Sequence, residues 1–310
     1  MKFNKIYVLG AGAVGCYFGG MLARARKDVT LIARPNRVNA INQHGLEMDC
    51  KSFQEVVPIK ASSDLKSLAD ADLILLSVKS PDTEQIIQEI ASTIPSQAVV
   101  VSLQNGVTNV DIATKHLKNP IYAAVVYVAA GMIGDRTMKH HGRGELYIGS
   151  LQGVTSDDQQ RLMAVCEAFE SAGVPCSIAA NLKKDMWLKF LVNCSFNAIS
   201  GIGQMAYGEM VRIPEIVQQI ENLTQEFLTI ATKEGVSISL EEAKEANALI
   251  ANTMVTQRSS TAQDLVRGKK TEIDFLNGYI VDLGKKHGIP VPYSETIVAM
   301  VKMLEQEKHH

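Results

Sequence analysis

The sequence has little of several features that mark specialised classes of protein. Its five cysteines are scattered and include no Cys-x-x-Cys pair, and aromatic residues make up only 5% of the 310 residues. Scattered cysteines in odd number predict reduced thiols rather than a disulfide framework or a zinc site, so we expect no metal. No apolar run reaches the length of a membrane span, and no secretory signal pattern opens the chain. We therefore expect a cytoplasmic protein without a membrane segment.

The chain also lacks an excess of charge of either sign. It carries 31 Lys and Arg residues against 33 Asp and Glu residues, a net charge of −2. This balance provides no field that would recruit nucleic acid or an anionic membrane. With 46% hydrophobic residues, the length fits about two globular domains with substantial cores. The pair His140-His141 has no metal-ligand spacing, and the terminal pair His309-His310 is either native or the remnant of a purification tag.

A glycine-rich turn lies close to the first residue. An apolar run from Ile6 enters Gly10-Ala11-Gly12-Ala13-Val14-Gly15, and apolar residues at helical spacing follow. Gly10 allows a tight turn, Gly12 lets a pyrophosphate approach the backbone, and Gly15 lets the helix pack on the strand. The N–H groups at the helix start, at Ala13 and Val14, would then face the phosphates of a dinucleotide. The alternative is an ordinary turn between a strand and a helix.

The second predicted strand, 28–33, ends about twenty residues after the glycines, where NAD-binding units usually have Asp or Glu. This chain has Arg34 instead, and no acid stands between Val29 and Leu46. A guanidinium binds a 2′-phosphate through charge-assisted hydrogen bonds, whereas a carboxylate would repel it. We therefore expect NADP(H) as cofactor. The alternative is that Arg34 is a solvated loop residue.

Strands and helices alternate over the first half of the chain and give way to helices in the second half. This predicts an α/β domain over 1–179, with a Rossmann-type doubly wound sheet, and an all-α domain over 180–310. The expected strands after the second are 72–78, 98–103, 121–130 and 145–148, with a short β excursion within 46–59. The expected helices of the second domain are 181–202, 214–234, 240–267, 271–287 and 294–306.

Two polar residues follow buried strands of the predicted sheet. Lys79 comes after the strand 72–78, and Asn105 comes after the strand 98–103. Ligands of open α/β sheets bind at the carboxyl ends of the strands, so both should face the nicotinamide half of the cofactor. The alternatives are an exposed ammonium at Lys79 and a simple turn at Asn105-Gly106.

The second domain carries a polar stripe in an otherwise apolar helix. Lys189, Asn193 and Asn197 are spaced i, i+4, i+8 and so lie on one helix face. Polar groups in so apolar a helix are costly to bury unless they bind something. The stripe is therefore either a substrate-facing row headed by an ammonium or a set of polar contacts within the core.

A further polar cluster holds Ser260 and Glu272. On one continuous helix they would lie ~18 Å apart, too far to share a small ligand. Gly268 breaks the helical pattern, however, and Thr271-x-x-Asp274 resembles a capping box that starts a new helix. Glu272 would then fold back towards Ser260. The alternative is that Glu272 only compensates a helix dipole.

These motifs together resemble the ketopantoate reductase (2-dehydropantoate 2-reductase) family, in the same order from end to end. The motifs that carry the resemblance are the glycine turn, Leu-Ser-Val-Lys79-Ser, Leu-Gln-Asn105-Gly, Trp-x-Lys189-x-x-x-Asn193-x-x-x-Asn197, Ser259-Ser260-x-x-Gln263-Asp264, Thr-Glu272-Ile-Asp and His-Gly-Ile-Pro-Val-Pro. The chain departs from the family's common Asn-x-Ser-Ser-Met at Gln257 and Thr261.

The resemblance implies a role for each matching residue. Lys189 would be the general acid, and Glu272 the carboxylate that orients it or the substrate. The substrate would be held by Asn193, Asn197 and Ser260, with Asn105 and Lys79 beside nicotinamide and substrate.

The expected reaction is NADPH-dependent reduction of 2-dehydropantoate to (R)-pantoate for pantothenate and coenzyme A biosynthesis. The alternatives are a D-2-hydroxyacid dehydrogenase acting on another 2-oxo acid and a non-catalytic NADPH-sensing protein. The only partner expected besides the small 2-oxo acid is a second copy in a homodimer.

Overall fold

A computed structural model describes residues 1–306, so the His309-His310 pair lies outside the described residues. The chain divides into two compact units, Met1–Leu182 and Lys183–His310. Each unit is described by itself below.

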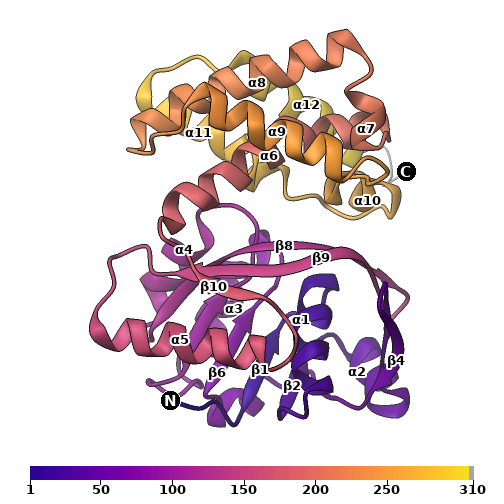
Figure 1. The fold of residues 1–310 in the computed structure, drawn as a ribbon, viewed down its shortest axis with the longest axis vertical. Helices are drawn as coiled ribbons and strands as arrows, with labels where there is room; N and C mark the ends of the chain where they lie inside the picture. The colour runs from indigo at the N-terminus through magenta and orange to yellow at the C-terminus, as the bar shows by residue number, and fades with distance from the viewer. Residues whose placement is uncertain (307–310) are drawn as a thin grey trace. The chain divides into compact units, whose positions relative to one another are not determined.

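The N-terminal unit is built on one mixed ten-stranded sheet (Figure 1). The strand order is β4-β3-β9-β8-β7-β6-β1-β2-β5, and β10 pairs with β9. The pairs from β8 through β7, β6, β1 and β2 to β5 are all parallel, as short apolar strands joined by helices predict. The strands are β1 Ile6–Leu9, β2 Val29–Ile32, β3 Leu46–Cys50, β4 Phe53–Val57, β5 Lys60–Ser62, β6 Leu73–Leu76, β7 Val99–Ser102, β8 Ile121–Ile133, β9 Thr137–Gly149 and β10 Cys176–Ile178.

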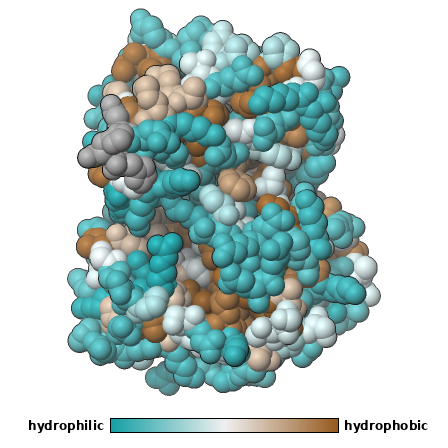
Figure 2. Space-filling view, turned by 180° about the vertical axis from the view of Figure 1, so that it is seen from behind, coloured by the Kyte–Doolittle hydropathy of each residue, from teal (hydrophilic) through white to brown (hydrophobic). Residues whose placement is uncertain are grey.

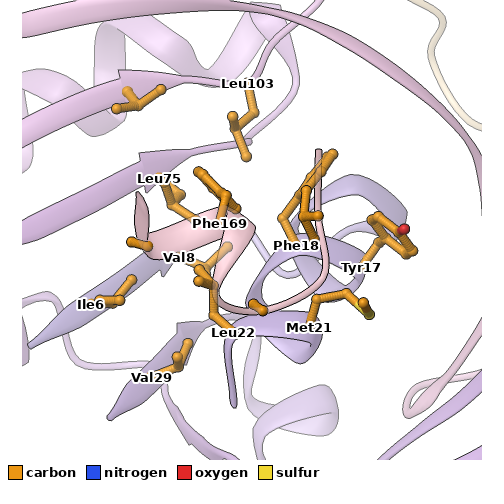
Figure 3. Packing of buried hydrophobic residues seen from close by; sticks show 14 of the residues in the cluster. Ile6, Val8, Tyr17, Phe18, Met21, Leu22, Val29, Leu75, Leu103 and Phe169 are labelled. Atoms are coloured by element: carbon orange, nitrogen blue, oxygen red, sulfur yellow. The ribbon is translucent and has the colours of Figure 1, made fainter. Parts of the chain in front are cut away.

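Successive residues of the central strands point into two separate cores, one on each face of the sheet. Ile6 and Val8 belong to one core, and Tyr7 and Leu9 to the other. The first core is closed by the helices α1 (Ala13–Arg24) and α5 (Ser156–Glu170), and the second by α3 (Thr83–Ile90) and α4 (Asn109–His116). In the first core the rings of Phe18 and Phe169 meet edge to face at 5.8 Å (Figure 3). Helices on both faces of a largely parallel sheet confirm the doubly wound prediction.

Several elements of this unit differ from the predicted ones. The hairpin of β8 and β9 is longer than expected, because β8 continues to Ile133 and β9 begins already at Thr137. The helix α4 and the short strand β10 were not predicted. The remaining helical elements are α2 Pro35–His44 and the 3₁₀ turns η1 Leu65–Asp70 and η2 Ser80–Asp82.

The described part of the C-terminal unit is all-helical, as predicted. Its elements are α6 Leu182–Gly203, α7 Tyr207–Met210, α8 Pro214–Lys233, α9 Leu240–Thr253, α10 Ser260–Val266, the 3₁₀ turn η3 Ile273–Phe275, α11 Asn277–His287 and α12 Pro292–Gln306. The rings of Trp187, Phe190 and Phe227 pack together, with centroids 5.1 to 5.8 Å apart, and join α6 to α8.

Two predictions about this unit are wrong. The predicted helix 240–267 is two helices, because residues 254–259 leave the helical path between α9 and α10. No capping box starts at Thr271, whose backbone N–H and hydroxyl both donate to Glu305 at 2.7 Å. Glu305, 34 residues away, therefore takes the place predicted for Asp274, while the Thr271 hydroxyl accepts the N–H of Ile273 at 3.2 Å.

The surface is largely hydrophilic in the view of Figure 2, with apolar side chains in separate patches. All five cysteines are buried and free: Cys16, Cys50, Cys166, Cys176 and Cys194. None of the helices within residues 1–306 combines the length and the apolar character that a bilayer span requires.

Candidate functional site

The glycine turn after β1 has the geometry that its three glycines predict. Gly10 has φ +107°, and a Cβ there would lie 2.6 Å from the backbone nitrogen of Val78. A Cβ on Gly15 would collide with the carbonyl oxygen of Gly10, whereas a Cβ on Gly12 would meet no atom within 4 Å. Gly10 and Gly15 are therefore required by packing, while Gly12 borders open space.

The helix α1 begins at this open space. Its N-cap residue is Gly12, no side chain caps it, and its first turn contains no acid. The first N–H groups of a helix have no intrahelical acceptor and attract anions. Ala13 and Val14, both half-buried, stand at the start of this helix. The turn therefore fits a dinucleotide pyrophosphate.

The end of β2 lies directly beside the glycine turn. The backbone N–H groups of Gly10 and Ala11 both donate to the carbonyl oxygen of Ile32, at 3.2 and 3.1 Å. Arg34 follows two residues later as the exposed N-cap residue of α2. Arg37 is more enclosed, and its Nη2 lies 3.9 Å from Asp135 in the β8–β9 turn. Of the two arginines, Arg34 is the more accessible to a ligand.

The strands β6 and β7 end at the same level of the sheet. Leu76 pairs with Ser102 in the parallel ladder, and Lys79 and Asn105 each follow three residues later. Both side chains are half-buried. The Ser77 hydroxyl donates to the carbonyl oxygen of Gly10 at 2.6 Å and so joins the β6 loop to the glycine turn. The cofactor residues predicted in this unit therefore gather at the carboxyl edge of the strands.

A buried polar network, which the sequence did not reveal, fixes these two loops. Gln104 donates to the carbonyl oxygen of Val78 at 2.9 Å and to the hydroxyl of Thr83 at 2.6 Å. Thr83 donates to Asn109 at 3.0 Å, and Asn109 donates to the carbonyl oxygen of Asn105 at 2.7 Å. These residues join the strand end of β7 to α3 and α4. Burial of so many polar side chains between two loops is visible only once the fold is known.

In the C-terminal unit, burial increases along the polar stripe of α6. Lys189 and Asn193 are half-buried, whereas Asn197 is only 5% exposed. Each step of four residues along the helix is ~6 Å. No side-chain hydrogen bond of Asn193 is found among residues 1–306, while the Oδ1 atom of Asn197 accepts one from the Tyr207 hydroxyl at 3.0 Å. The stripe therefore includes one accessible amide and one amide whose oxygen is held by Tyr207.

Ser259 ties the segment before α10 to α6. Its hydroxyl donates to the carbonyl oxygen of Asn197 at 2.8 Å and accepts the N–H of Ala262, so it caps α10. Its own N–H donates to the hydroxyl of Ser200 at 3.1 Å. The neighbouring Ser260 is exposed. These bonds hold Ser260 beside the buried end of the stripe.

Asn277 ties the segment after Glu272 to the same helix. Its buried amide donates to the carbonyl oxygen of Cys194 at 2.9 Å, one residue past Asn193. Glu272 is half-buried and immediately precedes η3. Both segments that carry predicted site residues are therefore bonded to α6 within the stripe. Ser259, Asn277 and Tyr207 were not predicted as site residues, because each acts over 10 to 83 residues of sequence.

Comparisons with known proteins indicate the same family over nearly the whole length of the chain. The family model "Ketopantoate reductase PanE/ApbA" matches residues 6–153, and "Ketopantoate reductase PanE/ApbA C terminal" matches residues 181–305. A 2-dehydropantoate 2-reductase of Pyrococcus horikoshii is 30% identical over 304 residues, 97% of each chain. One of Halobacterium salinarum is 28% identical over 306 residues, 98% of this chain and 99% of the relative.

Two solved structures have the same fold over nearly the whole chain. A PanE/ApbA family ketopantoate reductase from Ralstonia eutropha JMP134 is 43% identical, with a TM-score of 0.91 over 99% of this chain and 100% of the other. A D-mandelate dehydrogenase, solved with NADH and anilino(oxo)acetate, is 25% identical, with a TM-score of 0.91 over the same shares.

Proposed function

The chain belongs to the ketopantoate reductase family, and from this premise we propose that it reduces 2-dehydropantoate to (R)-pantoate with NADPH, for pantothenate and coenzyme A biosynthesis. Membership makes the protein an oxidoreductase that uses a nicotinamide cofactor. A non-catalytic NADPH sensor does not fit a family of reductases. The homodimer stays a prediction.

The cofactor's pyrophosphate would be held at the glycine turn, where Gly12 leaves room for it and Gly10 and Gly15 keep the backbone close. Arg34 would bind the 2′-phosphate, and Lys79 and Asn105 would lie beside the nicotinamide. When bound, the cofactor supplies the hydride that reduces the carbonyl carbon. The proton and the groups that bind the oxo acid would come from side chains of the protein.

The chemistry of the side chains centres on Lys189. Negative charge grows on the carbonyl oxygen during reduction, and an ammonium stabilises that charge and donates the proton. Asn193, Asn197 and Ser260 offer neutral hydrogen-bonding groups suited to a carboxylate and an oxo group. Glu272 would keep the lysine protonated or orient the substrate. What supports the proposal most is that hydrogen bonds from Ser259 and Asn277 attach the Ser260 and Glu272 segments to the helix of Lys189.

The direct experiment is a panel of 2-oxo acids, each assayed for kcat/KM with NADPH and with NADH. The proposal expects 2-dehydropantoate with NADPH to give the highest kcat/KM. A bulkier 2-oxo acid that exceeds it would favour the second candidate, a D-2-hydroxyacid dehydrogenase. That candidate is supported by the similarity to D-mandelate dehydrogenase and by the departures at Gln257 and Thr261.

Arg34→Ala should weaken the binding of NADPH much more than the binding of NADH. A charge-assisted hydrogen bond to phosphate is worth on the order of 1.5–3 kcal/mol, so KM for NADPH should rise about ten- to a hundredfold. Arg24→Ala is the matched control, because Arg24 pairs with Glu55 at the other end of α1. Equal losses for both cofactors in Arg34→Ala would contradict the assignment.

Asn193→Ala should raise KM for the oxo acid and leave the melting temperature nearly unchanged. The reason is that Asn193 is half-buried and its amide bonds no side chain among the described residues. Loss of one neutral hydrogen bond corresponds to a rise of about two- to tenfold. Asn252→Ala, an exposed asparagine of α9, is the control. A lower melting temperature with normal kinetics would make Asn193 a structural residue.

A further inference from the structure

Tyr207 is a buried tyrosine whose hydroxyl bonds a predicted substrate residue. It is 7% exposed, and its hydroxyl donates to the Oδ1 atom of Asn197 at 3.0 Å. None of the motifs that define the predicted site includes this tyrosine. Its only side-chain hydrogen bond among residues 1–306 is the one to Asn197.

This bond decides which way the Asn197 amide points. A carboxamide has an accepting oxygen and a donating NH₂ group of nearly the same shape, so an unheld amide can present either. The phenol hydroxyl provides a proton, which the oxygen accepts, and the NH₂ group is left on the other side. Within residues 1–306 that NH₂ group has no acceptor in the protein.

A 2-oxo acid at neutral pH has a carboxylate and an oxo group, and both only accept hydrogen bonds. If the Asn197 oxygen faced the oxo acid, it would repel either group, whereas the NH₂ group binds either group. We infer that Tyr207 is a positioning residue that orients Asn197 so that its NH₂ group donates to the 2-oxo acid. This inference rests on the proposed function, in which the oxo acid binds along the stripe of α6.

The surroundings of Tyr207 keep its hydroxyl in one place. Its ring meets Phe196 edge to face, with centroids 5.7 Å apart. Its N–H donates to the carbonyl oxygen of Gln257 at 3.0 Å, and the next residue, Gly208, donates to Val255 at 3.0 Å. Burial also raises the pKa of the phenol well above its ordinary value, so the hydroxyl remains a donor over the working pH range.

Tyr207→Phe tests the inference because it removes one oxygen and keeps the ring. We expect KM for the oxo acid to rise about five- to tenfold, the scale of one hydrogen bond, with kcat and the KM for NADPH within about twofold. Tyr293→Phe removes the same atom from a tyrosine that is 40% exposed and should change nothing. Unchanged KM for the oxo acid in Tyr207→Phe, with or without a lower melting temperature, would overturn the inference.

A double-mutant cycle separates action through Asn197 from a general loosening of the unit. Asn197→Ala alone should raise KM for the oxo acid, and Tyr207→Phe added to it should raise KM no further. Additive effects would show that Tyr207 does not act through Asn197. In Asn197→Asp the oxygen bonded by the phenol remains but the NH₂ donor is lost, so KM should rise at least as much as in Asn197→Ala.

The cycle is measured with whichever 2-oxo acid the unmodified enzyme reduces best. If that acid is not 2-dehydropantoate, the proposed substrate is wrong while the orientation of Asn197 is still tested. If the unmodified enzyme reduces no 2-oxo acid, the proposed function fails and the inference fails with it.

Discussion

Lys189→Ala is expected to lower kcat by about a hundredfold or more, the usual scale for loss of a general acid. No other residue of the α6 stripe can donate a proton to the developing alkoxide, because Asn193 and Asn197 carry neutral amides. The KM for NADPH should change little, since the residues proposed to bind the cofactor belong to the other unit. Single-turnover measurement of NADPH oxidation would report this step directly.

Lys183→Ala is the matched control for Lys189→Ala. Lys183 is an exposed lysine of the same helix, and its ammonium bonds the carbonyl oxygen of Glu234 at 3.0 Å. Its replacement should leave kcat within about twofold, since loss of one surface contact costs little. Near-normal turnover in Lys189→Ala would mean that the proton comes from another group and that the central assignment is wrong.

Glu272→Gln should depress kcat and move the alkaline limb of its pH profile to lower pH. Removal of a nearby carboxylate makes an ammonium easier to deprotonate, so the general acid is lost at a lower pH. Asp274→Asn is the control, because that carboxylate stands two residues away and pairs with Lys302 at 2.6 Å. An unmoved alkaline limb with a raised KM would make Glu272 a substrate ligand instead.

The second large effect is expected at the glycine turn. In Gly15→Ala the new methyl group would collide with the carbonyl oxygen of Gly10 and lie 2.5 Å from the Ser77 hydroxyl. Backbone of a buried strand end cannot move aside cheaply, and overpacking costs about 1–3 kcal/mol or more. We expect a loss of stability near the upper end of this range, which lowers the melting temperature by about 6–12 °C. We also expect cofactor binding to be lost.

Gly12→Ala separates folding from binding at the same turn. A Cβ at Gly12 meets no atom within 4 Å, and its φ of −79° suits any residue, so stability should be unchanged. The methyl group would nevertheless occupy the space assigned to the pyrophosphate. Calorimetric titration should therefore show NADPH affinity lowered by tenfold or more, since a close backbone approach is lost. Normal affinity in Gly12→Ala would place the phosphates elsewhere.

The features predicted correctly from the sequence are those encoded by neighbouring residues. The strand from Ile6, the turn at Gly10 and the apolar face of α1 all depend on residues within one supersecondary unit. The break between α9 and α10 was missed although Ser259 is a local N-cap of α10, because its N–H is also held by the hydroxyl of Ser200, 59 residues away. Local helix propensity does not report such a tertiary bond.

The candidate site shows the same division between local and distant interactions. The spacing of Lys189, Asn193 and Asn197 along one helix could be read directly from the sequence. The difference in hydrogen bonding between Asn193 and Asn197 could not be read in this way. It depends on the hydroxyl of Tyr207, which lies ten residues after Asn197 at the start of α7. Likewise, nothing near Gln104 in sequence indicates that it holds the loop of Lys79 through Val78.

Because all five cysteines are buried, alkylation of their thiols reports transient opening of the unit that contains them. A thiol reagent attacks the thiolate, and burial raises the pKa of Cys16 and Cys50 to about 11 and that of Cys194 well above its ordinary value, whereas a hydrogen bond with Cys176 lowers the pKa of Cys166, which is shielded by burial alone. Alkylation therefore marks molecules that have opened transiently. Four of the cysteines belong to the N-terminal unit and only Cys194 to the C-terminal unit. The mass added by alkylation, four adducts or one, distinguishes which unit opened.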